Sequence, residues 1–203
     1  MTTIRTPDFL QRALDAIESA HRVSSDYDLN PDIVLPVGRR LRPAGVLVLL
    51  AEMEDGWHVY LTKRSSALKH HPGQVSFPGG KQEEGDADIA ATALREANEE
   101  IGLPVEQVRI VGHLPVHETV TSFNVTPVVG LLDTVFPIVP QETEVAEVFT
   151  VPLSHVLDPE NYRVQSRRWQ GRWRSYYAVP YGPYYIWGAT ARMLRGWADA
   201  VER

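Results

Sequence analysis

The chain of 203 residues has a formal net charge of −6, with 43% hydrophobic and 23% charged residues, which is typical of a globular protein with a full core. Because the sequence contains no cysteine, disulfides, thiol nucleophiles and cysteine-based zinc sites are excluded. The negative charge and the lack of a long basic run argue against nucleic-acid binding, although bound metal ions could still supply positive charge for a phosphorylated substrate.

The N-terminal segment is expected to form a helix followed by an irregular connection. Apolar residues recur at helical spacing between Pro7 and His21, and residues 24–43 are polar and contain prolines. The N-terminus lacks the apolar core of a signal peptide, and the apolar run 46–51 is too short to span a bilayer. We therefore expect a cytoplasmic protein that does not bind membranes.

A β-hairpin is expected next. The run from Gly45 to Ala51 is apolar and typical of a buried strand, and residues 52–56 have turn chemistry. Residues 57–62 alternate like a second strand. Residues 63–86 are rich in glycine and proline toward their end, so we expect mostly loop there.

Helices and strands then alternate to the end of the chain. Residues 88–101 have a helical pattern that Gly102 is expected to end, and residues 186–201 predict a closing helix. Between them lie three expected strands, a short expected helix and an aromatic-rich segment: residues 108–114, 126–132, 146–151, 153–157 and 162–187. Without a regular βαβ rhythm, this order predicts an α/β fold of the α+β type, a mixed β-sheet sandwiched between helices. We expect one domain over residues 44–203, preceded by an N-terminal helix and connection in residues 1–43.

The chemistry is expected to reside on the helix around Glu96. Each residue of a helix advances by about 100°, so Glu100 lies about 40° from Glu96 and Glu99 about 60° away on its other side. The three carboxylates therefore share one face. The opposite stripe is apolar and can pack on a sheet; it consists of Leu94, Ala97 and Ile101.

This acidic face has two interpretations. It can be a solvated surface, although carboxylates at these spacings repel one another by about 0.2–0.5 kcal/mol per pair. It can also be a metal site, because Mg²⁺ is typically held by one or two carboxylates together with water and substrate phosphates. A glycine pair precedes the helix, an Arg95-Glu96 step lies within it and Gly102 follows it. This combination favours the metal site over coincidence.

With these residues in place, the chain resembles the Nudix hydrolases. Their motif reads Gly, five residues, Glu, seven residues, Arg-Glu, aliphatic, any residue, Glu-Glu, any residue, Gly, aliphatic. Gly80 begins this motif and residues 95–103 complete it. Two departures are present: Asp86 replaces the first glutamate, and eight residues rather than seven separate it from Arg95. The resemblance implies the Nudix fold and a hydrolase of diphosphate bridges that uses Mg²⁺ or Mn²⁺.

Within that family, the sequence looks like the coenzyme A pyrophosphatase branch. Residues 61–80 contain Leu-Thr-x-Arg-Ser, a basic residue and Gly-x-x-x-Phe-Pro-Gly-Gly, which is similar to the signature of that branch. The branch also tends to carry the Asp and the extra residue in its motif. It usually has arginine where this chain has Lys69, and arginine can bind a phosphate through two parallel hydrogen bonds whereas lysine cannot.

The segment upstream of the acidic helix is expected to bind the substrate. Its basic residues form the densest positive group near an otherwise acidic site: Lys63, Arg64, Lys69 and Lys81. Arg64 is the strongest candidate because it ends a predicted strand beside the glycine-rich loop. Gly79 and Gly80 are expected to let the backbone approach the substrate. The aromatic residues of 169–187 could stack an adenine, although packing in the core or between subunits is a commoner role.

The resemblance implies that a metal-activated water attacks one phosphorus of coenzyme A or acyl-CoA, releasing 3′,5′-ADP and 4′-phosphopantetheine. Glu96 and Glu100 are the expected metal ligands, and Glu99 is a third ligand or the general base. A downstream loop often adds a carboxylate in this family, and Glu144 is the best match. Its rivals are Glu142 and Glu147. The catalytic candidates are therefore Glu96, Glu99 and Glu144, and the choice of base is open.

Two other functions stay open at this point. A Nudix hydrolase for another diphosphate, such as a nucleoside-diphosphate sugar, a dinucleotide or an oxidised nucleotide, would keep the chemistry and change the pocket. A non-catalytic Nudix-fold binding module is the other alternative, and the complete set of helix glutamates argues against it. The expected partner is a small-molecule substrate rather than nucleic acid, and a homodimer is left open.

Overall fold

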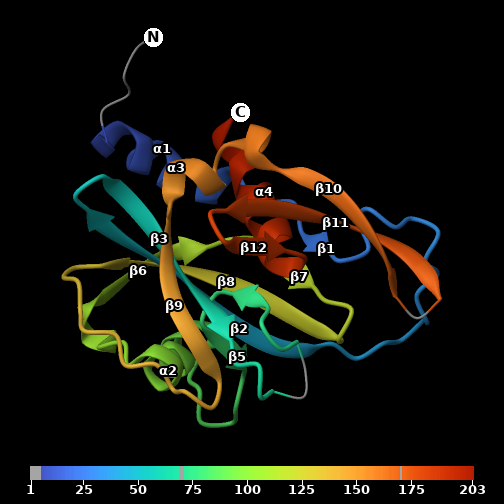
Figure 1. Cartoon of the computed structure of the whole chain (residues 1–203), viewed down its shortest axis with the longest axis horizontal. Coiled ribbons are helices and arrows are strands. Elements are labelled where there is room, and N and C mark those ends of the chain that lie inside the picture. Colours follow the sequence, from blue (N-terminus) through green and yellow to red (C-terminus); the bar gives the residue numbers. More distant parts are fainter. Residues whose placement is uncertain (1–5, 69–70, 170) are drawn as a thin grey trace.

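The computed structural model of the chain describes residues 6–68, 71–169 and 171–203 (Figure 1). Its helical segments are α1 (Thr6–Ser19), α2 (Ile89–Ile101), η1 (Val105–Gln107), α3 (Leu153–Val156), η2 (Pro159–Asn161) and α4 (Ala189–Val201). Its strands are β1 (Ser24–Ser25), β2 (Arg42–Met53), β3 (Gly56–Arg64), β4 (Val75–Ser76), β5 (Gly79–Lys81), β6 (Val108–His113), β7 (His117–Glu118), β8 (Phe123–Leu132), β9 (Val145–Pro152), β10 (Arg163–Trp169), β11 (Arg172–Tyr181) and β12 (Tyr184–Trp187).

The larger of the two sheets in these residues is mixed and centred on β2. Strand β2 runs antiparallel to β3 and β5 and parallel to β8, and the main strand order is β1-β7-β8-β2-β3-β4. Strand β6 adds to β8, and β9 adds to β3. The expected hairpin is confirmed as β2 and β3, joined by a tight turn at residues 54–55. The expected mixed sheet is confirmed as well.

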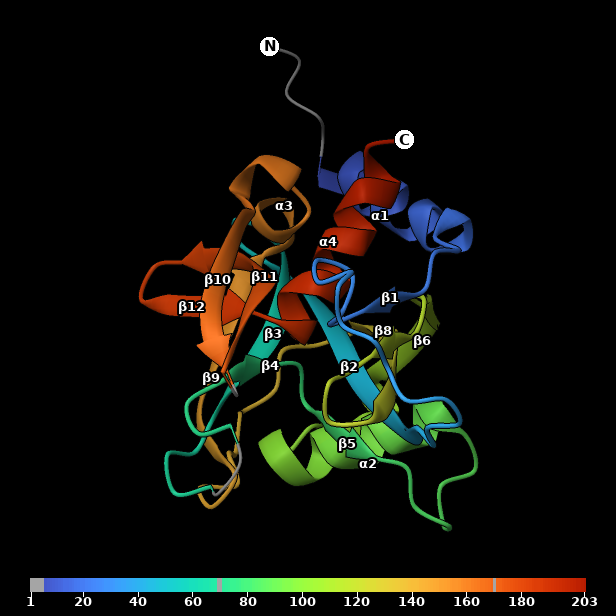
Figure 2. The ribbon, with the colours of Figure 1, turned by 90° about the vertical axis from the view of Figure 1, so that its right-hand side faces the viewer.

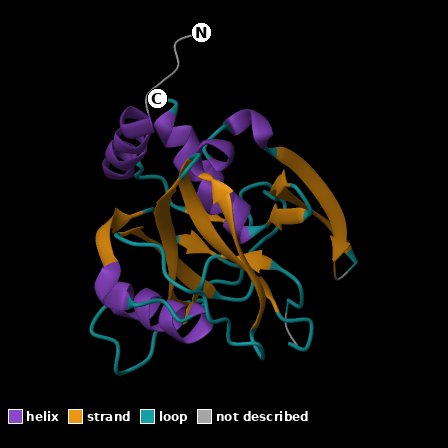
Figure 3. Ribbon diagram, turned by 60° about the vertical axis from the view of Figure 1, so that its left-hand side comes forward, coloured by secondary structure: helices purple, strands orange, loops and turns teal. Residues whose placement is uncertain are grey.

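Helices cover both faces of this sheet, as Figure 3 shows. On one face, α2 packs its small and apolar side chains against Leu47 and Leu49 of β2. On the other face, α1 and α4 pack against residues such as Val48 and Leu50. Because both faces are covered, successive residues of β2 are buried, which explains why its sequence is an uninterrupted apolar run.

The N-terminal helix α1 is part of the main core. Ala13, Ala16 and Ile17 are buried in the same cluster as α4, and the indole N–H of Trp197 donates to the backbone oxygen of Ala13 at 2.8 Å. Strand β1 adds to the edge of the large sheet by pairing with β7. The segment expected to be an irregular connection therefore contains a short strand.

Helix α2 has well-formed caps that set where its acidic residues lie. The side chain of Asp88 accepts a hydrogen bond from the N–H of Ala91 at 2.8 Å, which caps the N-terminus. Gly102 ends the helix in the left-handed conformation, with φ of 70°. Residues other than glycine are disfavoured in this conformation. The helix agrees with the expected residues 88–101 to within one residue.

A three-stranded antiparallel sheet, β10-β11-β12, forms from the aromatic-rich segment. It packs on α4 and on β4, as Figure 2 shows. Residues 63–86, which we expected to be mostly loop, also contain the short strands β4 and β5. None of the helices in the described part of the chain combines the length and the apolar character needed to cross a bilayer.

Candidate active site

The three glutamates of α2 differ strongly in burial. Glu100 is only 6% exposed, and its Oε2 accepts a hydrogen bond from the backbone N–H of Gly79 at 3.1 Å. The side chain of Glu96 is 17% exposed, whereas that of Glu99 is 58% exposed. Glu96 and Glu100 therefore face the interior near β5, and Glu99 faces solvent. The shared face expected from helical spacing is divided by the position of the sheet.

Burial disfavours the ionised forms of the two inner carboxylates and so raises their pKa values. The pKa of Glu100 is raised to about 8, mainly by burial and further by the charges of Glu96 and Glu144, while the N–H of Gly79 and the guanidinium of Arg64 offset part of the rise. The pKa of Glu96 is also raised, again mainly by burial, although Arg95 counteracts it. A cation placed between these carboxylates would stabilise their ionised forms.

Arg95 holds the acidic residues together from the solvent side. Its guanidinium donates to Asp86 at 2.9 and 3.0 Å, to Glu96 at 3.0 Å and to Glu99 at 3.3 Å. Asp86 also accepts from the hydroxyl of Thr92 at 2.9 Å. Hydrogen bonding to Arg95 is the main reason that the pKa of Asp86 lies well below its usual range. The altered motif therefore still places a carboxylate against Arg95.

The carboxylate of Glu96 lies directly against the backbone of Gly80. A Cβ atom at this position would overlap the carboxylate of Glu96. Gly79 and Gly80 pair with β2 through strand β5, at Val46 and Gly45 respectively. The glycine pair thus brings backbone, rather than side chains, between the acidic residues and the space in front of β5.

Glu144 is the downstream candidate whose charge acts on the carboxylates of the acidic helix. Its charge raises the pKa of both Glu96 and Glu100. The N–H of Ser65 donates to the backbone oxygen of Glu144 at 2.8 Å, which fixes it beside the end of β3. Of its two rivals, Glu147 accepts a hydrogen bond from the hydroxyl of Tyr184. Glu142 and Glu144 are both exposed, so the charge effect on Glu96 and Glu100 is what favours Glu144 over Glu142.

A cavity of about 670 Å³ lies on the other side of the glycine pair. One wall comes from β2, β4, β5 and the end of β3, and includes Arg64, Gly79, Gly80 and Lys81. The other wall comes from the small sheet and the start of α4. Among the described residues, the helix glutamates are not part of the lining; they lie next to it, in contact with Gly79 and Gly80.

The predicted substrate-binding residues fall into three groups. Arg64, Gly79 and Gly80 line the cavity. Lys63 is not among the described residues that line it. Lys69 lies outside the described residues. The Nε atom of Arg64 is buried and has no hydrogen-bond partner in the part of the chain that is described, so this cationic side chain has an unused donor beside the site.

Sequence reasoning missed the basic residues of the small sheet. Arg167 and Arg174 line the cavity together with the aromatic residues Trp169, Tyr176 and Trp187. The segment was noted only for its aromatic residues. The signal that could have found the pair is the two arginine-rich runs on either side of Gly171, because a hairpin there brings the runs side by side.

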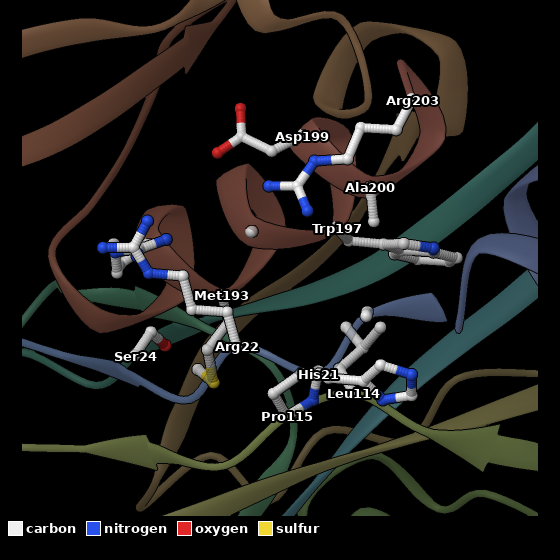
Figure 4. Close-up of a pocket in the computed structure, with 13 residues that line it drawn as sticks. His21, Arg22, Ser24, Leu114, Pro115, Met193, Trp197, Asp199, Ala200 and Arg203 are labelled. Carbon is white, nitrogen blue, oxygen red and sulfur yellow. The ribbon is translucent and has the colours of Figure 1, made fainter. Parts of the chain in front are cut away.

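A second, smaller cavity of about 60 Å³ lies against α4, and its lining in the described chain includes none of the predicted site residues. Figure 4 shows it between α4, which carries Met193 and Trp197, and the segment that carries His21 and Ser24. Helix α2 packs on the face of the large sheet opposite to α4. Of the two cavities, the larger is the one lined by Gly79 and Gly80, which contact Glu100 and Glu96.

The two inner glutamates beside the larger cavity suit a divalent cation by their chemistry. Glu96 and Glu100 supply hard oxygen ligands, and both have raised pKa values that a cation would lower. In the described ranges, no three histidine or acidic side chains already converge as a complete metal site. The structure therefore shows the carboxylates near one another without the arrangement that they would take around an ion.

The chain is similar to a known protein family over most of its length. The model of the NUDIX domain family matches residues 41–174. The chain is 42% identical over 154 residues to "Uncharacterized Nudix hydrolase NudL" of Enterobacter sp. (strain 638), covering 76% of this chain and 80% of that protein. It is 40% identical over 163 residues to the protein of the same name from Citrobacter koseri, covering 80% of this chain and 78% of that one.

Among solved structures, "Crystal structure of a Nudix Hydrolase from M. Smegmatis, RenU" superimposes with a TM-score of 0.46 and 22% identity, over 60% of this chain and 83% of that one. The sequence relatives carry the assignment, because the family model spans more than half of the chain and the matches extend over most of each relative. The chain belongs to the Nudix hydrolase family, whose members act on diphosphate-containing substrates and generally use divalent metal ions.

Proposed function

We propose that this Nudix hydrolase cleaves the diphosphate of coenzyme A or acyl-CoA, yielding 3′,5′-ADP and 4′-phosphopantetheine. The observation that carries the proposal is the cavity of about 670 Å³ in front of Gly79 and Gly80. Its size lies within the range of small-molecule sites, about 300–1,000 Å³. It combines a glycine backbone next to the acidic helix with basic and aromatic walls, which suits a nucleotide with several phosphates.

The charges around this cavity support an anionic ligand. In the described ranges, its lining contains the side chains of Arg64, Lys81, Arg167 and Arg174, and one carboxylate, that of Asp26. That carboxylate already accepts hydrogen bonds from the N–H of Val120 and lies 3.2 Å from Nε2 of His117. The chain as a whole has a net charge of −6, so the cavity lining is more positive than the chain as a whole.

In the proposed reaction, Glu96 and Glu100 would hold Mg²⁺ or Mn²⁺, with Glu99 or Glu144 as a further ligand. The metal would supply Lewis acidity and would lower the pKa of water. Arg64 neutralises charge on the diphosphate, and the backbone at Gly79 and Gly80 lets the substrate approach the acidic helix. Glu99 and Glu144 are the candidates for the general base. Attack of water on one phosphorus breaks its bond to the bridging oxygen, which leaves on the other phosphate.

The test is a mass-spectrometric substrate screen with Mg²⁺ and with Mn²⁺. Coenzyme A, acetyl-CoA, ADP-ribose, a nucleoside-diphosphate sugar and a dinucleotide are compared at equal concentration, with the Glu100→Gln variant as the negative control. We expect 3′,5′-ADP and a phosphopantetheine product, and a higher kcat/KM for the CoA substrates than for the others. In ¹⁸O-labelled water, the label then identifies the phosphorus that is attacked.

Two outcomes of this screen would contradict the proposal. Cleavage of ADP-ribose or of the sugar nucleotide, without cleavage of any CoA substrate, would assign the chain to another Nudix specificity. Cleavage of none of the five, with the fold intact by circular dichroism, would indicate a binding module.

A further inference from the structure

Two arginines lie side by side on adjacent strands of the small sheet. In the antiparallel pairing of β10 with β11, Arg167 is the register partner of Arg174. Residues that are directly opposite lie with their Cβ atoms about 4.5–5.5 Å apart and on the same face, and like charges at such positions are destabilising. Both residues line the cavity. The sheet thus carries an unfavourable pair of positive charges on the face that bounds the site.

Neither arginine has a carboxylate partner among the described residues. The arginine ion pairs within the described chain are formed by other arginines. The Nη2 atom of Arg174 is buried and has no hydrogen-bond partner among the described residues. A buried cationic donor that is left unpaired costs free energy. An anion between the two guanidinium groups would remove the repulsion and accept the unused hydrogen bonds.

Aromatic rings hold both guanidinium groups in place. Arg167 lies over the ring of Trp187 at 4.2 Å from its centroid, and Arg174 lies 5.0 Å from the ring of Trp169 and 5.3 Å from that of Tyr27. Such cation–π contacts restrict the long side chains before any ligand binds. The pair is therefore already ordered, which lowers the entropy cost of binding an anion.

The arginines that line the cavity in the described chain come from two parts of the fold. Arg64 ends β3 beside Glu100 and the glycine pair, and it is the cation placed for the diphosphate that is cleaved. Arg167 and Arg174 belong to the opposite wall. A substrate with one anionic group would use one of these regions. A substrate with a diphosphate and a distant phosphate would use both.

We propose that Arg167 and Arg174 bind a phosphomonoester on the nucleotide half of the substrate, which is not cleaved. This inference rests on the proposed function, in which that group is the 3′-phosphate of coenzyme A. A phosphomonoester presents three terminal oxygens and close to two negative charges, so two guanidinium groups can each donate to it. Sequence reasoning assigned phosphate binding to the segment upstream of the acidic helix, and the small sheet adds a second phosphate site.

The experiment compares coenzyme A with dephospho-coenzyme A, which lacks the 3′-phosphate, in the full chain and in four variants. For the unmodified protein, we expect kcat/KM to be about 10- to 100-fold higher for coenzyme A, the scale of one or two charge-assisted hydrogen bonds. In Arg167→Ala and in Arg174→Ala, this ratio should fall about 10-fold or more. Arg168→Ala is the matched control, because Arg168 is an exposed neighbour on β10 that does not line the cavity in the described chain. It should keep the ratio.

Several outcomes would overturn the inference. A ratio that stays unchanged in Arg167→Ala, or that falls equally in Arg168→Ala, would remove the pair from phosphate recognition. Because Arg174 contacts Tyr27 and Trp169, Arg174→Lys is included as a variant that keeps the charge; it should retain part of the ratio.

A binding measurement separates this inference from the proposed function. If the protein cleaves no CoA substrate, titration calorimetry with 3′,5′-ADP and with 5′-AMP still tests the site. We expect tighter binding of 3′,5′-ADP in the unmodified protein and the loss of this preference in Arg167→Ala. Equal affinities for the two nucleotides in the unmodified protein would contradict the second phosphate site.

Discussion

The backbone N–H of Gly79 donates a hydrogen bond to Oε2 of Glu100 across 3.1 Å. This bond joins the glycine-rich strand β5 to the buried side of the acidic helix α2, and it is a direct contact between the cavity wall and a proposed metal ligand. It also explains why Glu100, unlike Glu99, does not turn to solvent: its carboxylate lies under a strand that supplies a donor.

Replacing Glu100 by glutamine should abolish most of the activity and leave the fold intact. Glutamine preserves the size of the side chain and can still accept from Gly79, but it removes the anion that would bind the metal. We expect turnover to fall by about two orders of magnitude or more, the scale seen when a charge-stabilising group is lost. The measurement is kcat with Mg²⁺, with circular dichroism as the check of folding. Glu106→Gln, an exposed glutamate in η1, is the control, and near-normal turnover in Glu100→Gln would remove this residue from the site.

The raised pKa of Glu100 also predicts how stability depends on pH in the metal-free protein. Its pKa is about 8 in the folded chain and near the ordinary value of 4.5 in the unfolded chain. Between these values the folded state holds the proton more tightly, so this group's contribution to stability is present below about pH 4.5 and is lost as pH rises through about 8.

The difference in unfolding free energy between Glu100→Gln and the unmodified protein isolates this contribution. Urea denaturation in EDTA should show the glutamine variant gaining relative stability from pH 5 to pH 8.5, on the order of 1 kcal/mol for each pH unit within the window. Added Mg²⁺ should reduce the gain, because the unmodified carboxylate then has a cation. A difference that is constant across this pH range would show that Glu100 titrates normally.

Gly80→Ala should impair the site through a steric clash. A methyl group there would overlap the carboxylate of Glu96, so either β5 or the Glu96 side chain must shift. We expect kcat/KM to fall about 100-fold, in line with the effect of small misplacements at a reaction centre. Gly85→Ala is the matched control, because a Cβ at Gly85 would meet no heavy atom within 4 Å. Equal activities of the two variants would mean that the contact of Gly80 with Glu96 has no functional role.

Much of the fold could be predicted from the sequence because its signals are local. The limits of α2 follow from the Asp88 cap and the Gly102 stop, and the β2–β3 hairpin follows from two apolar runs around a turn. Strand β5 was missed because Gly79–Lys81 has no apolar pattern. It forms only because its backbone pairs with residues 44–46, which lie more than thirty positions earlier in the chain.

Only the local part of the candidate site could be predicted from the sequence. Helical spacing placed Glu96, Glu99 and Glu100 close together, but it could not show that β5 covers Glu100 and leaves Glu99 in solvent. The pairing of Arg167 with Arg174 depends on the register of a hairpin, which a shift by one residue would break. Long-range pairing is thus the information that the local sequence patterns lack.

Asp86→Asn should weaken the site by loosening Arg95. The asparagine retains one oxygen acceptor, but it lacks the charge that pairs with the guanidinium, so Arg95 is freer to neutralise Glu96 and Glu99. We expect a lower melting temperature and a moderate loss of kcat, about 10-fold, together with weaker activation by Mg²⁺. Glu84→Gln, an exposed change in the same loop, is the control.

Because the pKa of Asp86 is depressed, its contribution to stability is present above about pH 3.8 and is lost below it. The Asn variant should therefore lose less stability than the unmodified protein on acidification below that pH.

Glu144→Gln should distinguish this carboxylate from its two neighbours in sequence. The charge of Glu144 raises the pKa of both Glu96 and Glu100, whereas Glu147 is held by the hydroxyl of Tyr184. Glu142 is exposed like Glu144, so its exposure does not separate the two. If Glu144 is the base or a metal ligand, its replacement by glutamine should lower kcat by about 100-fold. Glu142→Gln should stay within about 3-fold of the unmodified protein, as surface changes usually do.

The pH–rate profile then separates the two roles of Glu144. If Glu144 is the base, Glu144→Gln should lose the acidic limb of kcat, and raising the Mg²⁺ concentration should not restore turnover, because the proton acceptor is gone. If Glu144 is a ligand, higher Mg²⁺ should restore part of the rate and the acidic limb should persist. Glu99→Gln, measured in parallel, tests the other candidate base with the same two readouts. Full activity in Glu144→Gln, together with a large loss in Glu147→Gln, would move the downstream carboxylate to the residue that contacts Tyr184.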